Sequence, residues 1–217
     1  MRALSTASEA DCRLIIDHVI YAHPNLDTAV AEIEERFGVR AAGGGQHPGR
    51  GTHNKVLGLG PRTYLEIIAP DPTQPEPSES RPYGVEGTIR GQLVGWALAC
   101  EDIERAVARG LSKGFDPGGV IDGQRVSPTG ALLRWRVTGN AQAAGLVPFL
   151  IEWGQTPHPA VDAARGLALL SVHLEHPDPR SLATALAALG ANVEVREASE
   201  PALVARIGGP QGEQELR

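Results

Sequence analysis

The stretch that decides the fold runs from residue 14 to residue 70. It reads LIIDHVIYA at 14–22, NLDTAVAEIEERFG at 25–38 and THNKVLGLGPRTYLEIIAP at 52–70. The first segment is almost entirely apolar, which predicts a strand covered on at least one face. The second has the spacing of an amphipathic helix, and the third predicts further short strands. The stretch therefore predicts one strand–helix–strands unit.

The helix of this unit is expected over residues 26–37. Its apolar face repeats at helical spacing, at Leu26, Val30, Ile33 and Phe37. Asn25 is a residue type that caps helix N-termini, and Gly38 is one that ends helices. The glycine run at 43–45 resembles a phosphate loop only superficially, because no helix with a Lys-Ser/Thr pair follows it. A bulged hairpin or a flexible rim is expected there instead.

The same order of elements returns twice along the chain. A strand at 93–100 is followed by a helix capped by Asp102, a Gly/Pro-rich loop at 116–130, and strands at 131–137 and 147–153. A third round begins with a strand at 167–174, continues with a helix after Asp178 and strands at 193–195 and 202–207, and then fades into a polar tail. Four prolines in residues 71–82 indicate a surface linker. The predicted units are a first module (14–70), a linker (71–92), a second module (93–156) and a partial third βαββ unit (167–210).

Composition limits the partners. The chain has 217 residues, which is enough for a sizeable core, and its formal net charge of −6 argues against a nucleic-acid partner. No apolar run approaches the roughly 20 residues of a membrane helix. Its two cysteines, Cys12 and Cys100, lie in unrelated contexts, so a disulfide framework or a cysteine zinc site is disfavoured. Residues 1–13 form a polar leader without a signal core, so a cytoplasmic protein is expected.

Three potential metal ligands or proton carriers lie on three separate predicted strands: His18, His53 and Glu66. Glu66 stands between Leu65 and Ile67, where a buried carboxylate is costly unless it is paired or bound to a metal. Glu152 repeats this situation in the second module. The ordinary alternatives are that His18 is a neutral core histidine and that Glu66 faces solvent.

Other polar residues of the predicted strands and turns are further candidates for the site. Arg134 and Arg136 share one face of a strand and Trp135 takes the other, so the arginines would either hold an anionic substrate or lie on a solvated outer face. Asn54 is expected to be structural or solvated. The His-Pro pairs at 23, 47, 158 and 176 indicate strand-ending turns, and their spacing suggests no ligand set.

Taken together, several segments resemble the vicinal oxygen chelate superfamily and, within it, the glyoxalase-like proteins. The resemblance spans residues 14–176 and rests on DHV (17–19), HPGRGTHN (47–54), YLEIIAP (64–70), GWAL (95–98) and PFLIEWG (148–154). It implies an α+β fold in which two βαβββ modules pair around a groove, here with the partial third unit added. The third unit could dock on the groove or on the second subunit of a homodimer, and the sequence leaves both open.

The resemblance also implies a divalent metal, held by the first and last strands of each module. His18 and Glu66 occupy two of these places and Glu152 a third, while the fourth falls at Gly95–Trp96, where neither side chain can ligate. His53 would then be a ligand or a catalytic residue. Mixed imidazole and carboxylate ligands suit Zn, Fe(II), Mn, Ni or Co without selecting one.

Two functions follow from this resemblance. The first is a metal-dependent lyase, isomerase or dioxygenase acting on a small oxygenated molecule, with the metal as Lewis acid and Glu66 or Glu152 as general base. The second is a metal-free protein that binds or sequesters a small molecule, which Trp96 in the groove would favour. A purely structural interaction module has little support in the sequence.

Overall fold

The computed structural model describes residues 14–127, 129–139 and 145–217, so the leader expected at 1–13 lies outside the described residues. The fold is α+β, as predicted. The first unit contains β1 (Ile15–Ala22), α1 (Leu26–Phe37), β2 (Ala42–His47), β3 (Thr52–Gly60) and β4 (Thr63–Pro70). The second contains β5 (Gln92–Ala99), α2 (Ile103–Ser112), β6 (Val120–Val126), β7 (Leu132–Thr138) and β8 (Phe149–Glu152). Short 3-10 helices follow each unit, η1 (Pro82–Gly87) and η3 (Pro159–Val161).

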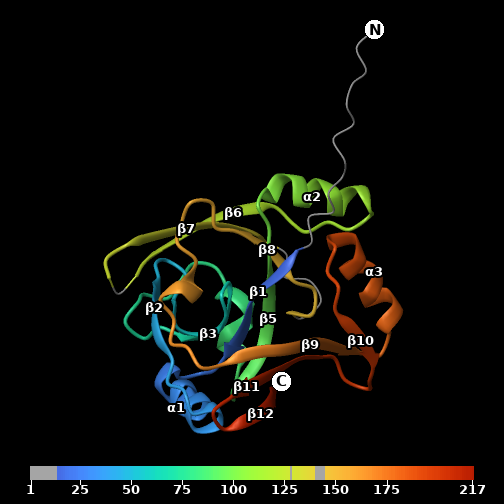
Figure 1. The fold of residues 1–217 in the computed structure, drawn as a ribbon. Coiled ribbons are helices and arrows are strands. Elements are labelled where there is room, and N and C mark those ends of the chain that lie inside the picture. The colour runs from blue at the N-terminus through green and yellow to red at the C-terminus, as the bar shows by residue number, and fades with distance from the viewer. Residues whose placement is uncertain (1–13, 128, 140–144) are drawn as a thin grey trace.

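The first two units form one eight-stranded sheet in the order β2-β3-β4-β1-β5-β8-β7-β6. In each unit the first strand pairs in parallel with the last, and the antiparallel pair β1–β5 joins the two halves. The sheet curls until its edge strands β2 and β6 contact each other (Figure 1). The groove implied by the resemblance is therefore the inner face of this curl.

The predicted helix ends agree with the structure. The Asn25 side chain accepts a hydrogen bond from the Thr28 backbone N–H at 2.9 Å, and Gly38 ends α1 with a φ of 76°. Asp102 caps α2 in the same way, by accepting from the Arg105 N–H at 2.9 Å. Local side-chain capping thus fixes the helix boundaries where the sequence places them.

The segment expected to be a loop at 116–130 contains a strand, β6. Apart from Arg125, every residue of β6 is exposed or half-buried, and the strand pairs only with β7. An edge strand of this kind has no apolar alternation, which is why its sequence resembles a loop.

The third unit has one strand more than the sequence indicates. It contains β9 (Ala168–His176), α3 (Pro179–Leu189), β10 (Glu194–Glu197), β11 (Ala202–Gly209) and β12 (Gly212–Leu216), in a sheet of order β10-β9-β11-β12. The predicted polar tail is β12, which pairs only with β11 and buries only Leu216, so it carries no strand pattern. The Arg217 carbonyl accepts a hydrogen bond from the Leu93 N–H at 2.8 Å and ties the tail to β5.

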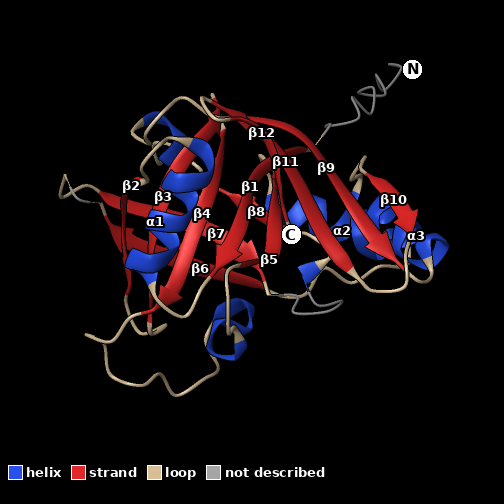
Figure 2. Cartoon of the chain, turned by 90° about the horizontal axis from the view of Figure 1, so that it is seen from below, coloured by secondary structure: helices blue, strands red, loops and turns tan. Residues whose placement is uncertain are grey.

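The third unit packs on the side of the eight-stranded sheet that faces the helices. One core joins residues of all three units, including Val19, Trp96, Leu174 and Ile207, while a separate core on the inner face includes Ile20, Ile68 and Phe149. Figure 2 shows β9–β12 beside β5, with α3 beyond them. The inner face therefore stays free of the third unit. No helix in the described ranges is long and apolar enough to span a membrane.

Candidate functional site

A cavity of about 300 Å³ lies on the inner face of the curled sheet, between its two halves. This volume is at the small end of the range for ligand pockets. Polar side chains of β1, β3 and β4 form one wall: His18, Asn54, Tyr64 and Glu66. Aromatic and aliphatic side chains from the second half form most of the opposite wall: Trp135, Val137, Phe149, Ile151 and Trp153.

His18 reaches this cavity beside a β-bulge. The register of β1 against β5 shifts between Ile16 and His18, which leaves Asp17 without a partner residue on β5. Asp17 Oδ1 lies 2.7 Å from His18 Nδ1, and both residues are buried. The bulge therefore brings two neighbouring side chains together that a regular strand would send to opposite faces.

Two more groups hold the Asp17 carboxylate. Its Oδ2 accepts a hydrogen bond from Trp153 Nε1 at 3.1 Å and lies 3.0 Å from His158 Nε2. His158 Nδ1 accepts from the Ala160 backbone N–H at 3.2 Å, so a neutral His158 carries its proton on Nε2 and donates it to Asp17. Asp17 thus accepts three hydrogen bonds in a site without solvent access.

These bonds keep Asp17 ionised. Burial raises the pKa of its carboxyl, but the hydrogen bonds and charges of His158 and His18 outweigh that effect and bring the pKa to about 2. An ionised Asp17 can only accept from His18 Nδ1, so a neutral His18 carries its proton there. The lone pair on His18 Nε2 is then available on the cavity side.

Glu66 lies opposite that nitrogen. Its Oε2 is 3.7 Å from His18 Nε2, and its Oε1 accepts from Asn54 Nδ2 at 2.6 Å. The same Oε1 lies 3.7 Å from Nε2 of His47, whose pKa is lowered by burial. Glu66 is only 6% exposed, so a buried carboxylate here stands between two imidazoles and an amide.

Aromatic contacts fix the His18 ring. The Tyr64 ring stacks on it at 4.6 Å between centroids, and the Phe149 ring meets it edge-on at 5.5 Å. Burial raises the pKa of Tyr64 well above its usual value, so its hydroxyl stays protonated. A ring held this way presents Nε2 in one direction, which suits proton transfer or ligation.

Of the residues predicted for the site, His18 and Glu66 are brought together in the cavity. His53 lies on the other face of β3, with its Nδ1 4.0 Å from Asp71 Oδ1, and Asn54 faces the cavity in its place. Trp96 is also placed differently from the expectation. It is fully buried in the core on the helix side, and its Nε1 donates to the Leu146 carbonyl at 2.8 Å.

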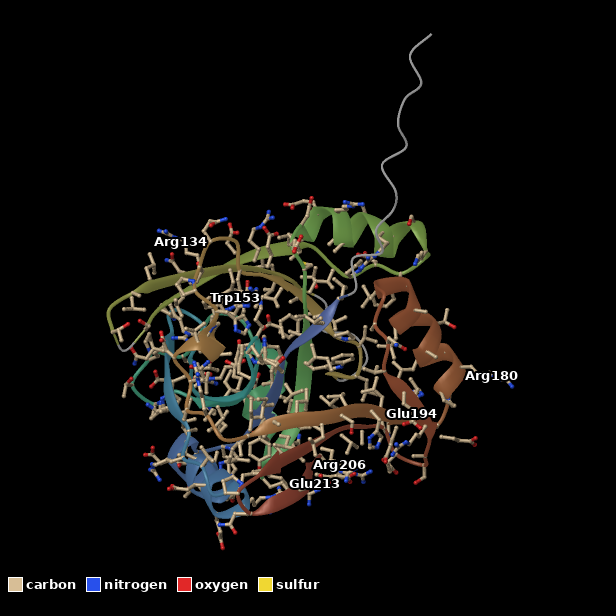
Figure 3. All side chains as sticks on the ribbon, viewed as in Figure 1. Arg134, Trp153, Arg180, Glu194, Arg206 and Glu213 are labelled. Atoms are coloured by element: carbon tan, nitrogen blue, oxygen red, sulfur yellow. The ribbon has the colours of Figure 1, made fainter. Side chains whose placement is uncertain are left out.

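Glu152 and the two arginines also lie outside this cavity, on the side of α2. Glu152 Oε2 accepts from the Ile103 backbone N–H at 3.0 Å, at the start of α2, and from Arg136 Nη2 at 2.6 Å. Arg134 and Arg136 line a second, more open depression next to Glu152. Figure 3 shows Arg134 at the outer edge of the molecule and Trp153 further inside. The solvated alternative for the arginines agrees with this placement.

Several groups that line the cavity or support it from behind do not stand out in the sequence. His47 and His158 belong to the His-Pro pairs interpreted as turns, and Asn54 was expected to be structural or solvated. The adjacent acid and imidazole of Asp17 and His18 were the one available signal, because a carboxylate often orients a functional histidine. Nothing in the sequence around Arg125, the buried residue of β6, indicates that it lines the cavity.

The donor set does not fit the metal that the resemblance implies. Among the residues that the structure describes, no group of three or more His, Cys, Asp or Glu side chains is arranged to hold a metal ion. Ala97 pairs with His18 across β1–β5, and Ile151 lines the cavity from β8. These two apolar residues stand where the second half would have to supply ligands.

Two βαβββ units curled around one central cavity define a protein of the glyoxalase-like class. A family model described as "Glyoxalase-like domain" matches residues 16–190, so the chain belongs to this family, within the vicinal oxygen chelate superfamily. No curated protein matches the chain.

Solved structures resemble it in fold. A hypothetical protein from Staphylococcus aureus is 13% identical, with a TM-score of 0.62 over 92% of each chain. Methylmalonyl-CoA epimerase from Mycobacterium tuberculosis is 18% identical, with a TM-score of 0.44 over 67% of this chain and 91% of that one. A Streptomyces coelicolor methylmalonyl-CoA epimerase variant is 18% identical, with a TM-score of 0.47 over 67% of this chain and 98% of that one.

Proposed function

We propose that this protein is an enzyme that transfers a proton on a small oxygenated molecule bound in the cavity, with His18 as the proton carrier. The observation that supports this best is the line Asp17–His18–Glu66. A buried carboxylate orients an imidazole whose free nitrogen faces a second buried carboxylate at 3.7 Å. Titratable groups held in this way within a cavity are typical of acid–base catalysis.

The roles of the three residues follow from their hydrogen bonds. Asp17 holds the proton on His18 Nδ1 and stabilises the imidazolium that forms when Nε2 accepts a proton from the substrate. Glu66 is a second acid–base group, and the amide of Asn54 fixes one of its oxygens. A proton removed from a carbon next to a carbonyl by one of these groups could be returned by the other. This is the chemistry of an isomerase.

The metal-dependent reaction suggested by the resemblance would use His18 and Glu66 as ligands, and the ion would supply a Lewis acid. The apolar Ala97 and Ile151 leave β5 and β8, the strands of the second half that match β1 and β4, without a ligand at the cavity. We therefore assign the proton transfer to the side chains themselves, and the test below includes a metal arm.

A second candidate is a protein that binds a small molecule without converting it. Trp135 and Trp153 lie 5.5 Å apart between ring centroids at the cavity wall, and Tyr83 stacks on Phe149 at 5.7 Å. Aromatic walls of this kind suit a flat apolar ligand. This candidate and the enzyme make different predictions for substrate protons.

The test is deuterium exchange at carbon, followed by NMR in D₂O. The probes are ketones with slow spontaneous exchange, among them 4-oxopentanoate and 4-oxo-4-phenylbutanoate. The wild-type protein should accelerate exchange next to the carbonyl, and His18→Gln and Glu66→Gln should each reduce that rate by about 10²–10⁴-fold. His53→Gln is the matched control, because His53 lies on the other face of β3.

Each outcome separates the candidates. Exchange that persists in both cavity variants would refute the proposal. Binding of a probe without exchange would favour the sequestering protein. Exchange that a chelator abolishes and a divalent ion restores would instead support the metal-dependent reaction.

A further inference from the structure

The one buried residue of β6 is an arginine. Arg125 is 5% exposed, whereas its six neighbours on the strand are exposed or half-buried. Its side chain lines the same cavity as His18 and Glu66, but from the opposite edge of the curled sheet. An edge strand that buries only a cation needs an explanation, because burying an arginine is unfavourable unless the charge is compensated.

The glycine run of β2 makes room for this side chain. Arg125 Nη1 donates to the Gly44 carbonyl at 2.8 Å, which links the two edges of the sheet. Gly44 has a φ of 78°, and a Cβ at this position would lie 2.0 Å from the Asn54 carbonyl oxygen. A Cβ at Gly45 would lie 2.9 Å from the Val126 carbonyl oxygen. Glycine at 44 is therefore required by the close contact of β2 with β3, and glycine at 45 lets β2 approach β6 closely enough for this bond.

The carbonyl of Gly44 is a neutral partner and does not balance the charge. Within the described ranges, no carboxylate oxygen lies within 4.0 Å of the Arg125 guanidinium. By contrast, the more exposed Arg136 pairs with two carboxylates, Glu104 and Glu152. Burial lowers the pKa of Arg125, as expected for a desolvated cation, and the electrostatic effects of Tyr64 and then Glu66 oppose this shift without reversing it. A buried, unpaired cation on a cavity wall is therefore suited to an anionic ligand.

We propose that Arg125 binds an anionic oxygen group of the substrate, a carboxylate or a phosphate, while His18 and Glu66 act on its carbonyl end. The proposal rests on the function proposed above and names its substrate class. The substrate would be a small oxyanion that contacts both halves of the sheet. Its charge would lie near the junction of β2 and β6, and its reacting carbon near β1 and β4. The aromatic walls between these ends suit a flat or apolar middle portion.

The test compares pairs of ligands in which one member carries an anionic oxygen group and the other is neutral. The first pair is 4-oxo-4-phenylbutanoate and its methyl ester, which tests a carboxylate. The second pair is phenyl phosphate and phenol, which tests a phosphate. Calorimetry on the full chain should show that the wild-type protein binds at least one anion about tenfold or more tighter than its neutral partner, as expected for a charge-assisted bidentate bond.

Variants then assign that preference to Arg125. Arg125→Met should bind the preferred anion and its neutral partner within about twofold of each other. Arg134→Met is the matched control on the adjacent strand β7, and it should keep the full preference. The inference is overturned if neither anion exceeds its neutral partner in the wild type, or if the preference survives in Arg125→Met.

A structural role for Arg125 predicts a different result. If Arg125 serves only to tie β6 to Gly44, Arg125→Met and Arg125→Lys should both have a strongly lowered Tm or fail to fold. Either of these outcomes, if both variants show it, would overturn the inference. If Arg125 is kept for binding, the ligand-free Arg125→Met protein should have an unchanged or higher Tm, because an unpaired buried charge is removed. Arg125→Lys should then fold and keep part of the anion preference, because it retains the charge without the bidentate geometry.

The two proposals fail in different ways. His18→Gln should lose deuterium exchange but keep the anion preference. If the wild-type protein shows that preference but no exchange, proton transfer is refuted and the anion site stands. If exchange is equally fast for the acid and its ester, and is unchanged in Arg125→Met, the anion site is refuted and proton transfer stands.

Discussion

The two halves of the curled sheet share a backbone plan and differ in chemistry. Both run strand, helix and three strands, with the first strand parallel to the last, and they meet at β1–β5. On the inner face, the first half presents His18, Asn54 and Glu66. The second half presents Ala97, Phe149 and Ile151 at its matching strands. The fold thus supplies equivalent strands in the two halves, and at these strands the side chains of the first half are polar and those of the second are apolar.

This difference explains why the implied metal site is incomplete. His18 pairs with Ala97 across the junction, so the opening strand of one half offers an imidazole and that of the other offers a methyl group. With no ligand on β5 and β8, we propose that the side chains of the first half transfer the proton themselves. The apolar wall is then free to bind the uncharged part of a substrate.

The largest predicted change is in metal affinity, and it should follow from giving the second half a carboxylate like that of the first. Ile151→Glu places a carboxylate in the cavity opposite His18 and Glu66. We expect its Zn²⁺ affinity to exceed that of the wild type by roughly 10- to 100-fold, measured by competition with a chromophoric chelator. Leu132→Glu, at an exposed site on β7, is the control for added charge. Equal zinc affinity in Ile151→Glu and the control would show that the missing ligand is not what separates the halves.

The next largest predicted change is a loss of stability on removal of the Asp17 charge behind His18. Asp17→Asn leaves His18, His158 and Trp153 with a neutral partner that accepts less strongly and brings an extra donor. Breaking a buried charged network of this kind typically costs about 3 kcal/mol, which urea unfolding of both proteins would measure. A loss below about 0.5 kcal/mol would mean that Asp17 does not support the wall.

The same carboxylate predicts a pH dependence. The pKa of Asp17 falls from 3.8 to about 2 on folding, so its contribution to stability is complete above pH 4 and is lost as the pH falls toward 2. The difference of 3.8 − 2, about 1.8 pH units, corresponds to roughly 2.4 kcal/mol of unfolding free energy. Urea unfolding from pH 5 to pH 2 should show this loss in the wild type and a smaller one in Asp17→Asn. Parallel curves for the two proteins would contradict the assignment.

The sequence can predict this site only as far as it assigns each strand residue to the inner or the outer face of the sheet. His18 and Glu66, which both line the cavity, stand out in the sequence because each is a polar residue within an apolar strand, where burial needs a partner. Alternation also separated Trp135 correctly from Arg134 and Arg136. It could not tell which face is the inner one, because both faces of this sheet are covered, one by the cavity wall and one by helices and the third unit. His53, Trp96 and Glu152 therefore lie one residue away from the cavity-facing Asn54, Ala97 and Ile151.

Other features depend on contacts between distant segments. Arg125 is buried because β6 contacts β2. The two residues that form the hydrogen bond between these strands, Arg125 and Gly44, are 81 residues apart in the sequence. His158 reaches Asp17 across 141 residues. Strands β6 and β12 have partners on one side only and carry no apolar alternation. Patterns along the chain indicate the elements, but they contain no information on such long-range pairs.

The smallest predicted changes, in probe binding and stability, concern Tyr83 in the linker between the halves. Tyr83 is the one non-glycine residue with a positive φ, 61°, in the part of the chain that the structure describes. This conformation costs a side-chain-bearing residue roughly 1–2 kcal/mol, and it aims the Tyr83 ring at Phe149 on the apolar wall. Strain kept at a cavity wall suggests that the ring has a binding role.

Tyr83→Gly removes both the strain and the ring. We expect its unfolding free energy to rise or stay within about 1 kcal/mol of the wild type, while a flat probe such as 4-oxo-4-phenylbutanoate binds roughly 3- to 10-fold more weakly. Tyr83→Ala loses the ring but keeps the strain, so it separates the two effects by being less stable than Tyr83→Gly. Unchanged probe binding in both variants would remove Tyr83 from the apolar wall and leave the strain without a function.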